Sequence, residues 1–226
     1  AEVDAAVLSF EMLVYGGLIP SRTSNTSMEE VNRRVSTILS LPSRFPDVTF
    51  LISAVVMRIP SYNTPPTDFE DPWYWDEFGF DIYSFSYYTD QADSTNNATA
   101  RSLASEYRSR IPPPILSDWE WRRSRNNNAT IRLLTHFPPS SFPFFSLYIT
   151  EDDSAKWGFN AAEARHLRSL VAGAGLEKEV KIYPGADEVG LVLLARLSIH
   201  LEHATTPTLS TLYLFPNASS LIPSFE

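Results

Sequence analysis

The amino-acid sequence predicts an α/β protein with a mainly parallel β-sheet and flanking helices. Two observations lead to this prediction. Short apolar runs rich in β-branched residues alternate along the chain with segments of helical periodicity. The run at residues 48–57 (VTFLISAVVM) is apolar almost throughout, which is the pattern of a strand buried on both faces of a parallel sheet. We favour an open doubly wound sheet, and part of a barrel is the alternative.

The bulk composition fits one domain. The chain has 226 residues, of which 43% are hydrophobic and 20% charged, and this is enough for a sizeable core. No internal repeat or low-complexity linker divides it, so we expect a single α/β domain over residues 1–226. No signal peptide is visible, and the chain starts almost directly with a predicted strand. We therefore expect it to be a piece of a longer protein.

Charge and residue usage exclude several classes of partner. The net charge of −9 argues against nucleic acid, because phosphate recognition favours a basic face. The absence of cysteine excludes disulfides and thiolate metal sites. No apolar run reaches the roughly 20 residues of a membrane span. Composition says nothing about the oligomeric state.

Four N-x-S/T sequons favour a secreted protein or one of the secretory pathway, with the cytoplasm as the alternative. The candidate glycosylation sites are Asn25, Asn97, Asn128 and Asn217.

The first third of the chain reads as strand, turn, helix and strand. A short strand at 5–10 leads to a tight turn at Gly16 and Gly17, which needs the conformational freedom of glycine. Ser27 is the predicted N-cap of a helix that Pro42 and Pro46 end. The buried strand at 48–57 completes a βαβ unit.

Residues 62–92 form an aromatic and proline-rich insert that is too long for a plain connection. One interpretation is that it lies over the strand ends and lines a pocket. The other is a surface segment that packs on itself.

The remaining elements continue the alternation. Helices are expected at 95–110 and from Ser117 to about residue 134, the second open to interruption at the asparagines 126–128. The later elements are strands at 142–150, 179–183 and 212–215 and helices at 161–173 and 189–203. Gly158 and Gly185 are predicted to form structural turns.

Acidic residues follow two of the predicted strands. The candidate catalytic residues are Asp152, Asp153, Asp187 and Glu188. Parallel strands end at one edge of the sheet, so these carboxylates are expected to converge there. Carboxylates in one cleft raise at least one pKa and suit general acid–base chemistry, including glycoside hydrolysis. The alternative is that they cap the following helices.

Other polar side chains are candidates for binding the substrate by hydrogen bonds and ion pairs. They are Glu11, Tyr15, Arg22, Arg58, Arg123, Arg125 and Asn126. The alternative for the arginines is solvation or pairing with surface acids. No nucleophile elbow, P-loop or dinucleotide motif is present. No cofactor is predicted, and a divalent metal is conceivable although no motif supports one.

Five motifs together resemble a known family. In chain order they are SFEMLVYGGLIPSR, VVMRIPSY, RSRNNNAT, ITEDDSAKWGFNAAEARHL and YPGADEVGLVLLAR. Their order and spacing are similar to the domain of unknown function 4127 family over nearly the whole chain. The resemblance implies that the chain is the middle portion of proteins about twice as long. It implies a site built from Tyr15, Gly16, Gly17, Arg22, Arg58, Arg123, Arg125, Asn126, Asp152, Asp153, Gly158, Gly185, Asp187, Glu188 and Arg196. It supplies no reaction.

The functional prediction is a hydrolase-like enzyme that acts on a polar, carbohydrate-type substrate through carboxylates at the C-terminal ends of the strands. The alternative is a module that binds a small polar or glycan ligand in the same cleft without turnover.

Overall fold

The fold is a parallel α/β sheet, as predicted. The computed structural model describes residues 3–65, 69–136, 146–151, 155–185 and 188–201. Its four strands are β1 (Ala5–Ser9), β2 (Thr49–Val56), β3 (Ser146–Glu151) and β4 (Val180–Pro184). They pair in the order β1-β2-β3-β4, and every neighbouring pair is parallel. Within the described residues this sheet is open.

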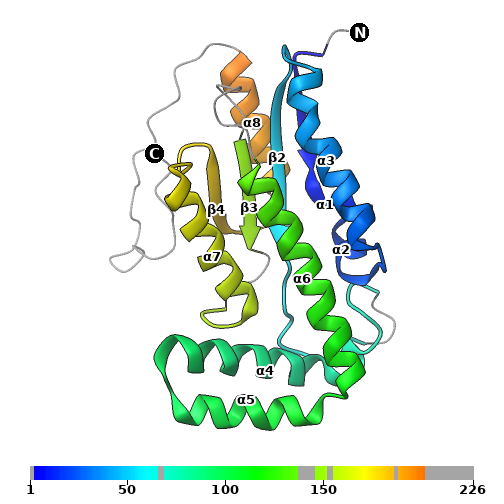
Figure 1. Ribbon diagram of the computed structural model, residues 1–226, viewed down its shortest axis with the longest axis vertical. Coiled ribbons are helices and arrows are strands. Elements are labelled where there is room, and N and C mark those ends of the chain that lie inside the picture. The colour runs from blue at the N-terminus through cyan, green and yellow to red at the C-terminus, as the bar shows by residue number, and fades with distance from the viewer. Residues whose placement is uncertain (1–2, 66–68, 137–145, 152–154, 186–187, 202–226) are drawn as a thin grey trace.

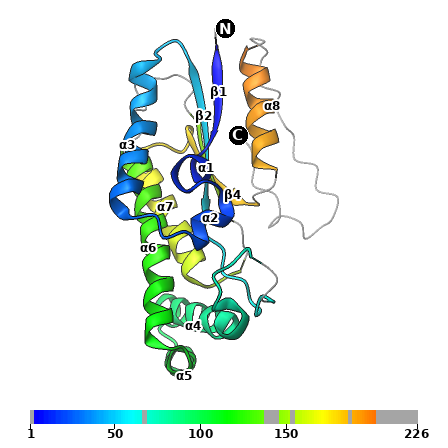
Figure 2. The same cartoon turned by 90° about the vertical axis from the view of Figure 1, so that its right-hand side faces the viewer.

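Helices lie on both faces of the sheet. They are α1 (Phe10–Tyr15), α2 (Leu18–Thr23), α3 (Met28–Arg44), α4 (Trp75–Thr95), α5 (Ala98–Arg110), α6 (Pro113–Thr135), α7 (Phe159–Ala174) and α8 (Val189–Leu201). Figures 1 and 2 show α3, α6 and α7 on one face and α8 on the other. The three crossovers between successive strands therefore run over the same face.

Strand β2 is buried on both faces, as its continuous apolar run predicts. Phe50 and Ile52 belong to the core beneath α3, α6 and α7. Leu51 points the other way and packs with Tyr183 and Leu193 in the core under α8. This alternation is the two-residue period of a strand.

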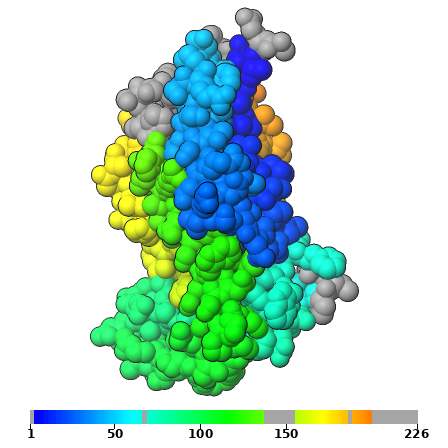
Figure 3. All heavy atoms as spheres, turned by 45° about the vertical axis from the view of Figure 1, so that its right-hand side comes forward, coloured from blue at the N-terminus to red at the C-terminus, as the bar shows by residue number. Residues whose placement is uncertain are grey.

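A second layer lies beyond the C-terminal ends of the strands. Helices α4 and α5 pack against the N-terminal half of α6 around Trp75, Ile82 and Trp119. The C-terminal half of α6 contributes Leu133 to the sheet core. Helix α6 therefore joins the two layers, and Figure 3 shows it running from one into the other. Most of the aromatic insert at 62–92 is the regular helix α4.

Several element boundaries differ from the sequence prediction. The turn before α2 is preceded by a helix, α1, whose N-cap Ser9 accepts a hydrogen bond from the N–H of Met12. Ser27 caps α3 as predicted, but Pro42 lies inside that helix, where it is buried. Tertiary packing outweighs the helix-breaking tendency there. The strand expected at 212–215 lies outside the described residues.

Helix α6 is not interrupted at the asparagines. The low helix propensity of asparagine costs less than about 1 kcal/mol per residue. The side chain of Asn126 donates to the backbone oxygen of Ser21 at 2.8 Å, and Thr130 and Ala129 are buried on the same helix. Contacts with the rest of the chain thus decide the conformation.

Candidate functional site

A cleft of about 550 Å³ opens at the C-terminal edge of the sheet. It lies where the chain leaves β1 and β2, the position at which parallel sheets usually bind ligands. Its lining residues are Gly17, Leu18, Ile19, Pro20, Arg22, Arg58 and Glu70. The cleft has the size of a small-molecule site, and two of the predicted binding residues, Arg22 and Arg58, face it.

The two arginines of the cleft share one buried carboxylate. Nη2 of Arg58 lies 3.0 Å from Oδ2 of Asp71, and Nη1 of Arg22 lies 3.8 Å from Oδ1 of the same residue. Nη2 of Arg58 also donates to Oε2 of Glu70 at 2.9 Å. The side chains of Asp71 and Arg22 are each 4% exposed, whereas that of Glu70 is 49% exposed. One buried and one accessible carboxylate therefore contact the cations of this cluster.

The glycine pair sets the direction of the chain into the cleft. Gly16 has φ 97° and ends α1 in the left-handed conformation, and Gly17 has φ 144°. The N–H of Gly17 donates to the backbone oxygen of Glu11 at 3.1 Å. Positive φ at two successive positions favours glycine. The reversal that it allows starts α2 and brings Arg22 beside Arg58.

Glu11 and Tyr15 are buried behind this turn. Oε1 of Glu11 accepts a hydrogen bond from the N–H of Val55 at 2.8 Å, which ties α1 to β2. Burial raises the pKa of Glu11 to about 7, although the Val55 hydrogen bond opposes the shift. Burial also raises the pKa of Tyr15. Neither residue lines the cleft.

Arg125 and Asn126 hold the loop between α2 and α3. Arg125 donates to the backbone oxygens of Ser21, Ser24 and Thr26 at 2.6, 2.8 and 3.2 Å. Its guanidinium carbon also lies 4.8 Å from the ring centre of Tyr15. Arg125 is buried, so it supports the wall of the cleft and does not face into it.

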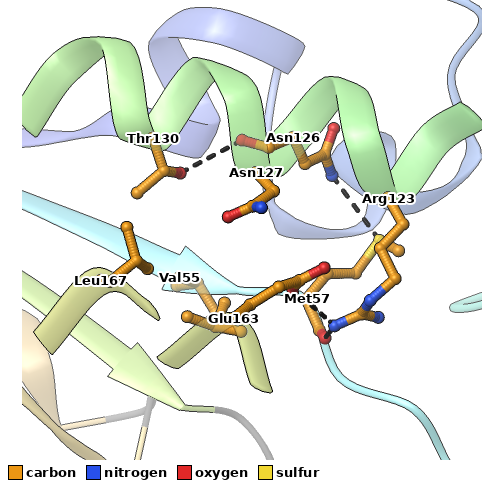
Figure 4. A pocket seen from close by; sticks show the side chains of 9 residues that line it. Val55, Met57, Arg123, Asn126, Asn127, Thr130, Glu163 and Leu167 are labelled. Carbon is orange, nitrogen blue, oxygen red and sulfur yellow. Dashed lines mark hydrogen bonds and ion pairs between the residues drawn. The ribbon is translucent and has the colours of Figure 1, made fainter. Parts of the chain in front are cut away.

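Arg123 faces a smaller cavity between α6, α7 and the end of β2 (Figure 4). Its Nη2 donates to the backbone oxygen of Met57 and to Oε2 of Glu163, both at 2.8 Å. Burial raises the pKa of Glu163, and the charge of Arg123 opposes this. Nε and Nη1 of Arg123 are buried and have no hydrogen-bond partner among the described residues. The cavity of about 10 Å³ is the size of one water molecule.

The predicted catalytic acids are only partly described. Asp152, Asp153 and Asp187 lie outside the described residues. Glu188 is exposed at the start of α8, and its carboxylate contacts the position that a Cβ on Gly185 would occupy. The expected convergence of the four carboxylates therefore stays a prediction.

The start of α7 bears on the capping alternative for Asp152 and Asp153. The helix begins at Phe159, and its N-cap is Gly158. The N–H of Gly158 donates to Oδ2 of Asp90 at 2.9 Å, and that of Phe159 donates to Oγ of Ser86 at 2.7 Å. Side chains of α4 thus satisfy the first N–H groups of α7. This N-cap lies five residues after Asp153 in the sequence, and the two aspartates themselves lie outside the described residues.

The remaining predicted positions are distributed over the surface and the turns. Gly158 and Gly185 have positive φ of 135° and 110°. Asn97 is exposed and caps α5, and Asn128 is exposed on α6. Oδ1 of Asn25 accepts a hydrogen bond from Nη2 of Arg122 at 2.7 Å. Asn217 lies outside the described residues.

Four acidic residues of these networks were absent from the sequence prediction. Glu70 and Asp71 belong to the aromatic insert at 62–92, which one of the two interpretations placed over the strand ends. The pair Asp71-Pro72 is a weak signal in the sequence. Asp90 and Glu163 lie on helices, and nothing in the sequence distinguishes them from solvated acids. Their partners are more than 30 residues away.

The described residues form neither a metal site nor a membrane span. No group of three or more histidine, aspartate and glutamate side chains there is close enough to hold a metal ion. None of the described helices combines the length and apolarity that crossing a membrane requires.

The sheet order and the cleft define an α/β protein with a polar cleft at the C-terminal ends of its parallel strands. The chain belongs to the family described as "Protein of unknown function (DUF4127)", whose profile matches residues 1–226. The resemblance drawn from the five motifs is therefore confirmed. Comparison with curated proteins and with solved structures gave no match.

Proposed function

We propose that the protein is a hydrolase-like enzyme whose cleft at the C-terminal edge of the sheet binds a polar, carbohydrate-type substrate. The observation that carries the proposal is the cleft itself, with Arg22 and Arg58 paired to Asp71 at the ends of β1 and β2. Forked guanidinium groups recognise hydroxyl and carboxylate oxygens with defined geometry.

The topology supports this location. Parallel crossovers are right-handed, so a chain that reverses direction along the sheet must cross the opposite face. Helix α8 follows β4 on that opposite face and contacts β1 and β2. We infer a doubly wound sheet in which the next strand pairs with the outer edge of β1. The switch in strand direction would then fall at β1, next to the cleft, where open α/β sheets bind ligands.

An exposed aromatic side chain supports a sugar as the ligand. Trp73 is 78% exposed and lies three residues after Glu70, which lines the cleft. Large aromatic rings expose an apolar face of the kind that stacks on sugar rings. The buried Trp119, by contrast, stacks on Phe159 in the core.

The chemical step is assigned to the acidic motifs after β3 and β4. In glycoside hydrolysis, one carboxylic acid protonates the leaving oxygen, and a carboxylate either attacks the sugar carbon or activates a water molecule. Asp152, Asp153, Asp187 and Glu188 are the proposed source of these groups. Arg58 and Arg22 would hold the substrate.

Activity on a panel of glycans tests the proposal. Asp153→Asn and Glu188→Gln should each lower the rate of product formation by about 100-fold or more, which is the usual contribution of a general acid or base. Glu177→Gln, at an exposed glutamate before β4, is the matched control and should keep the rate of the unmodified protein. Unchanged activity of both test variants would contradict the assignment.

The competing function is ligand binding without turnover. It is favoured by one observation: both described acids near the cleft, Glu70 and Asp71, form ion pairs with arginines. A binding module would show saturable affinity and return its ligand chemically unchanged. An enzyme would release product under the same conditions.

A further inference from the structure

We propose that the cleft binds amphipathic glycosides. Its charged residues hold the sugar, and an apolar wall formed by Met12, Ile19 and Pro20 holds an aryl or alkyl group attached to that sugar. This inference rests on the proposed function for the sugar itself. It adds the chemical class of the group that the sugar carries.

The residues that line the cleft fall into two groups of different chemistry. Arg22, Arg58 and Glu70 carry charged side chains, whereas residues 17–20 are glycine, leucine, isoleucine and proline. Ile19 is 41% exposed, so a ligand in the cleft can reach its side chain. The cleft therefore combines a charged part with an apolar part.

Helix α1 extends the apolar part. A Cβ on Gly17 would lie 3.4 Å from Cδ of Pro20 and 3.9 Å from Cε of Met12. The proline ring and the methionine methyl group thus lie beside the glycine that lines the cleft. Met12 is 60% exposed, and a methionine side chain adapts its shape easily to a partner. Single apolar side chains are common on protein surfaces, but a group of them at a cleft indicates a binding site.

The backbone oxygens of residues 17–20 all accept hydrogen bonds within the protein. The N–H groups of Ser21 and Ser24 donate to the first and the last of them at 3.0 and 2.9 Å. The hydroxyl groups of Ser21 and Thr23 donate to the two in between at 2.6 and 3.1 Å. This stretch therefore needs no polar ligand group to satisfy its carbonyl oxygens, and it offers a ligand mainly apolar side chains.

The apolar wall favours a ligand that is not polar throughout. A plain sugar would leave the wall in contact with water. An aryl or alkyl group on the sugar would cover the wall, and burying about 60 Å² of apolar surface raises the affinity about tenfold. Small-molecule sites usually combine apolar walls with a few polar groups that fix the orientation of the ligand. The charged residues of the cleft would supply that orientation.

Calorimetric titration of the purified protein with phenyl β-D-glucopyranoside and methyl β-D-glucopyranoside tests the inference. The two probes share the sugar and differ only in the attached group. The phenyl glucoside should bind at least about tenfold more tightly. Ile19→Ser should lower the affinity for the phenyl glucoside by about three- to tenfold and change that for the methyl glucoside by less than about twofold, because it removes only apolar surface.

Leu194→Ser is the matched control. Leu194 is 51% exposed and lies on α8, outside the lining of the cleft, so this variant should keep both affinities of the unmodified protein. A melting curve of each variant verifies that it is folded. Ile19→Val retains most of the apolar surface and should keep the preference for the phenyl glucoside.

Equal affinities for the two glucosides would overturn the inference. It is also overturned if Ile19→Ser binds the phenyl glucoside as tightly as Leu194→Ser does. If Ile19→Ser instead changes the oligomeric state and leaves both affinities unchanged, the apolar wall is a protein interface and the inference is wrong.

The same probes separate this inference from the proposed function. Tight binding of the phenyl glucoside without hydrolysis of any glycan would contradict only the enzyme. Hydrolysis of glycans together with equal affinities for the two glucosides would contradict only the inference. Absence of binding to either glucoside and of hydrolysis of any glycan would contradict both.

Discussion

Nη2 of Arg125 donates a hydrogen bond to the backbone oxygen of Ser21 at 2.6 Å, across 104 residues of sequence. The same side chain binds two further backbone oxygens of the loop between α2 and α3. That loop follows Arg22, one of the cations of the cleft. Arg125 therefore positions the wall of the cleft from behind, through α6.

Arg125→Lys should destabilise the protein by about 2 kcal/mol. Lysine has a single ammonium group, which cannot reach three separated backbone oxygens with the forked geometry of arginine. Asn126 and Arg122 still donate to the backbone oxygens of Ser21 and Ser24, so the cost is that of the lost hydrogen bonds to a charged donor, about 1.5–3 kcal/mol each. Urea denaturation measures the change. Arg101→Lys, at an exposed arginine of α5, is the control and should change stability by less than about 0.5 kcal/mol. If the two variants lowered the free energy of unfolding equally, Arg125 would have no particular role in holding the loop.

Glu11 should make the stability of the fold depend on pH. Its pKa rises from the ordinary 4.5 to about 7 in the folded protein. Between these values the folded chain keeps a proton that the unfolded chain has released, so the free energy of unfolding falls as the pH rises from about 4.5 to 7. The fall is about 3 kcal/mol in size and ends above pH 7.

Glu11→Gln imitates the protonated side chain and keeps an acceptor for the N–H of Val55. The variant should therefore lack this decline and be more stable than the unmodified protein at pH 8. Unfolding by urea at pH 5 and pH 8 measures both effects, with the exposed Glu29→Gln as control. A variant with the same pH profile as the unmodified protein would show that Glu11 does not titrate in this range.

Two glycines near α7 should respond to alanine in opposite directions. Gly158 has φ 135°, and a Cβ there would lie 2.6 Å from Oδ1 of Asn160. Gly158→Ala should lower the free energy of unfolding by about 1–3 kcal/mol. Gly173 lies inside α7, and no described atom outside its own helical turn lies within 4 Å of the Cβ position. Gly173→Ala should therefore raise the free energy of unfolding by about 0.5–1 kcal/mol.

Thermal and urea unfolding of both variants provide the measurement. The opposite signs are the essential result, because the two substitutions are chemically identical. If Gly158→Ala were as stable as Gly173→Ala, the backbone at the start of α7 would not need glycine.

The sequence predicts the sheet well because strand signals are local. The continuous apolar run of β2 and the N-cap Ser27 depend only on neighbouring residues, and both are confirmed. Helix α4 was not predicted, because its aromatic residues have no clear helical period and are buried by α5 and α6. The uninterrupted α6 depends on contacts of Asn126 with a loop 105 residues away.

The candidate site likewise has features that the sequence predicts locally and features that depend on long-range contacts. The positions of Arg22 and Arg58 near one edge follow from the rule that parallel strands end together. The acids that pair with them, Asp71 and Glu70, could not be identified, since the path of a long connection depends on tertiary packing. The burial of Arg125 was missed for the same reason: exposed and buried arginines look alike in a sequence.

The most direct test of the central claim is amide chemical-shift mapping of the ¹⁵N-labelled protein during titration with D-glucuronate and D-glucose. The claim is that the ligand occupies the cleft at the C-terminal edge of the sheet. Shifts should concentrate at Gly17, Ile19, Arg58 and Glu70, which line the cleft. Shifts confined to α5 or α8, or none with either sugar, would contradict the claim.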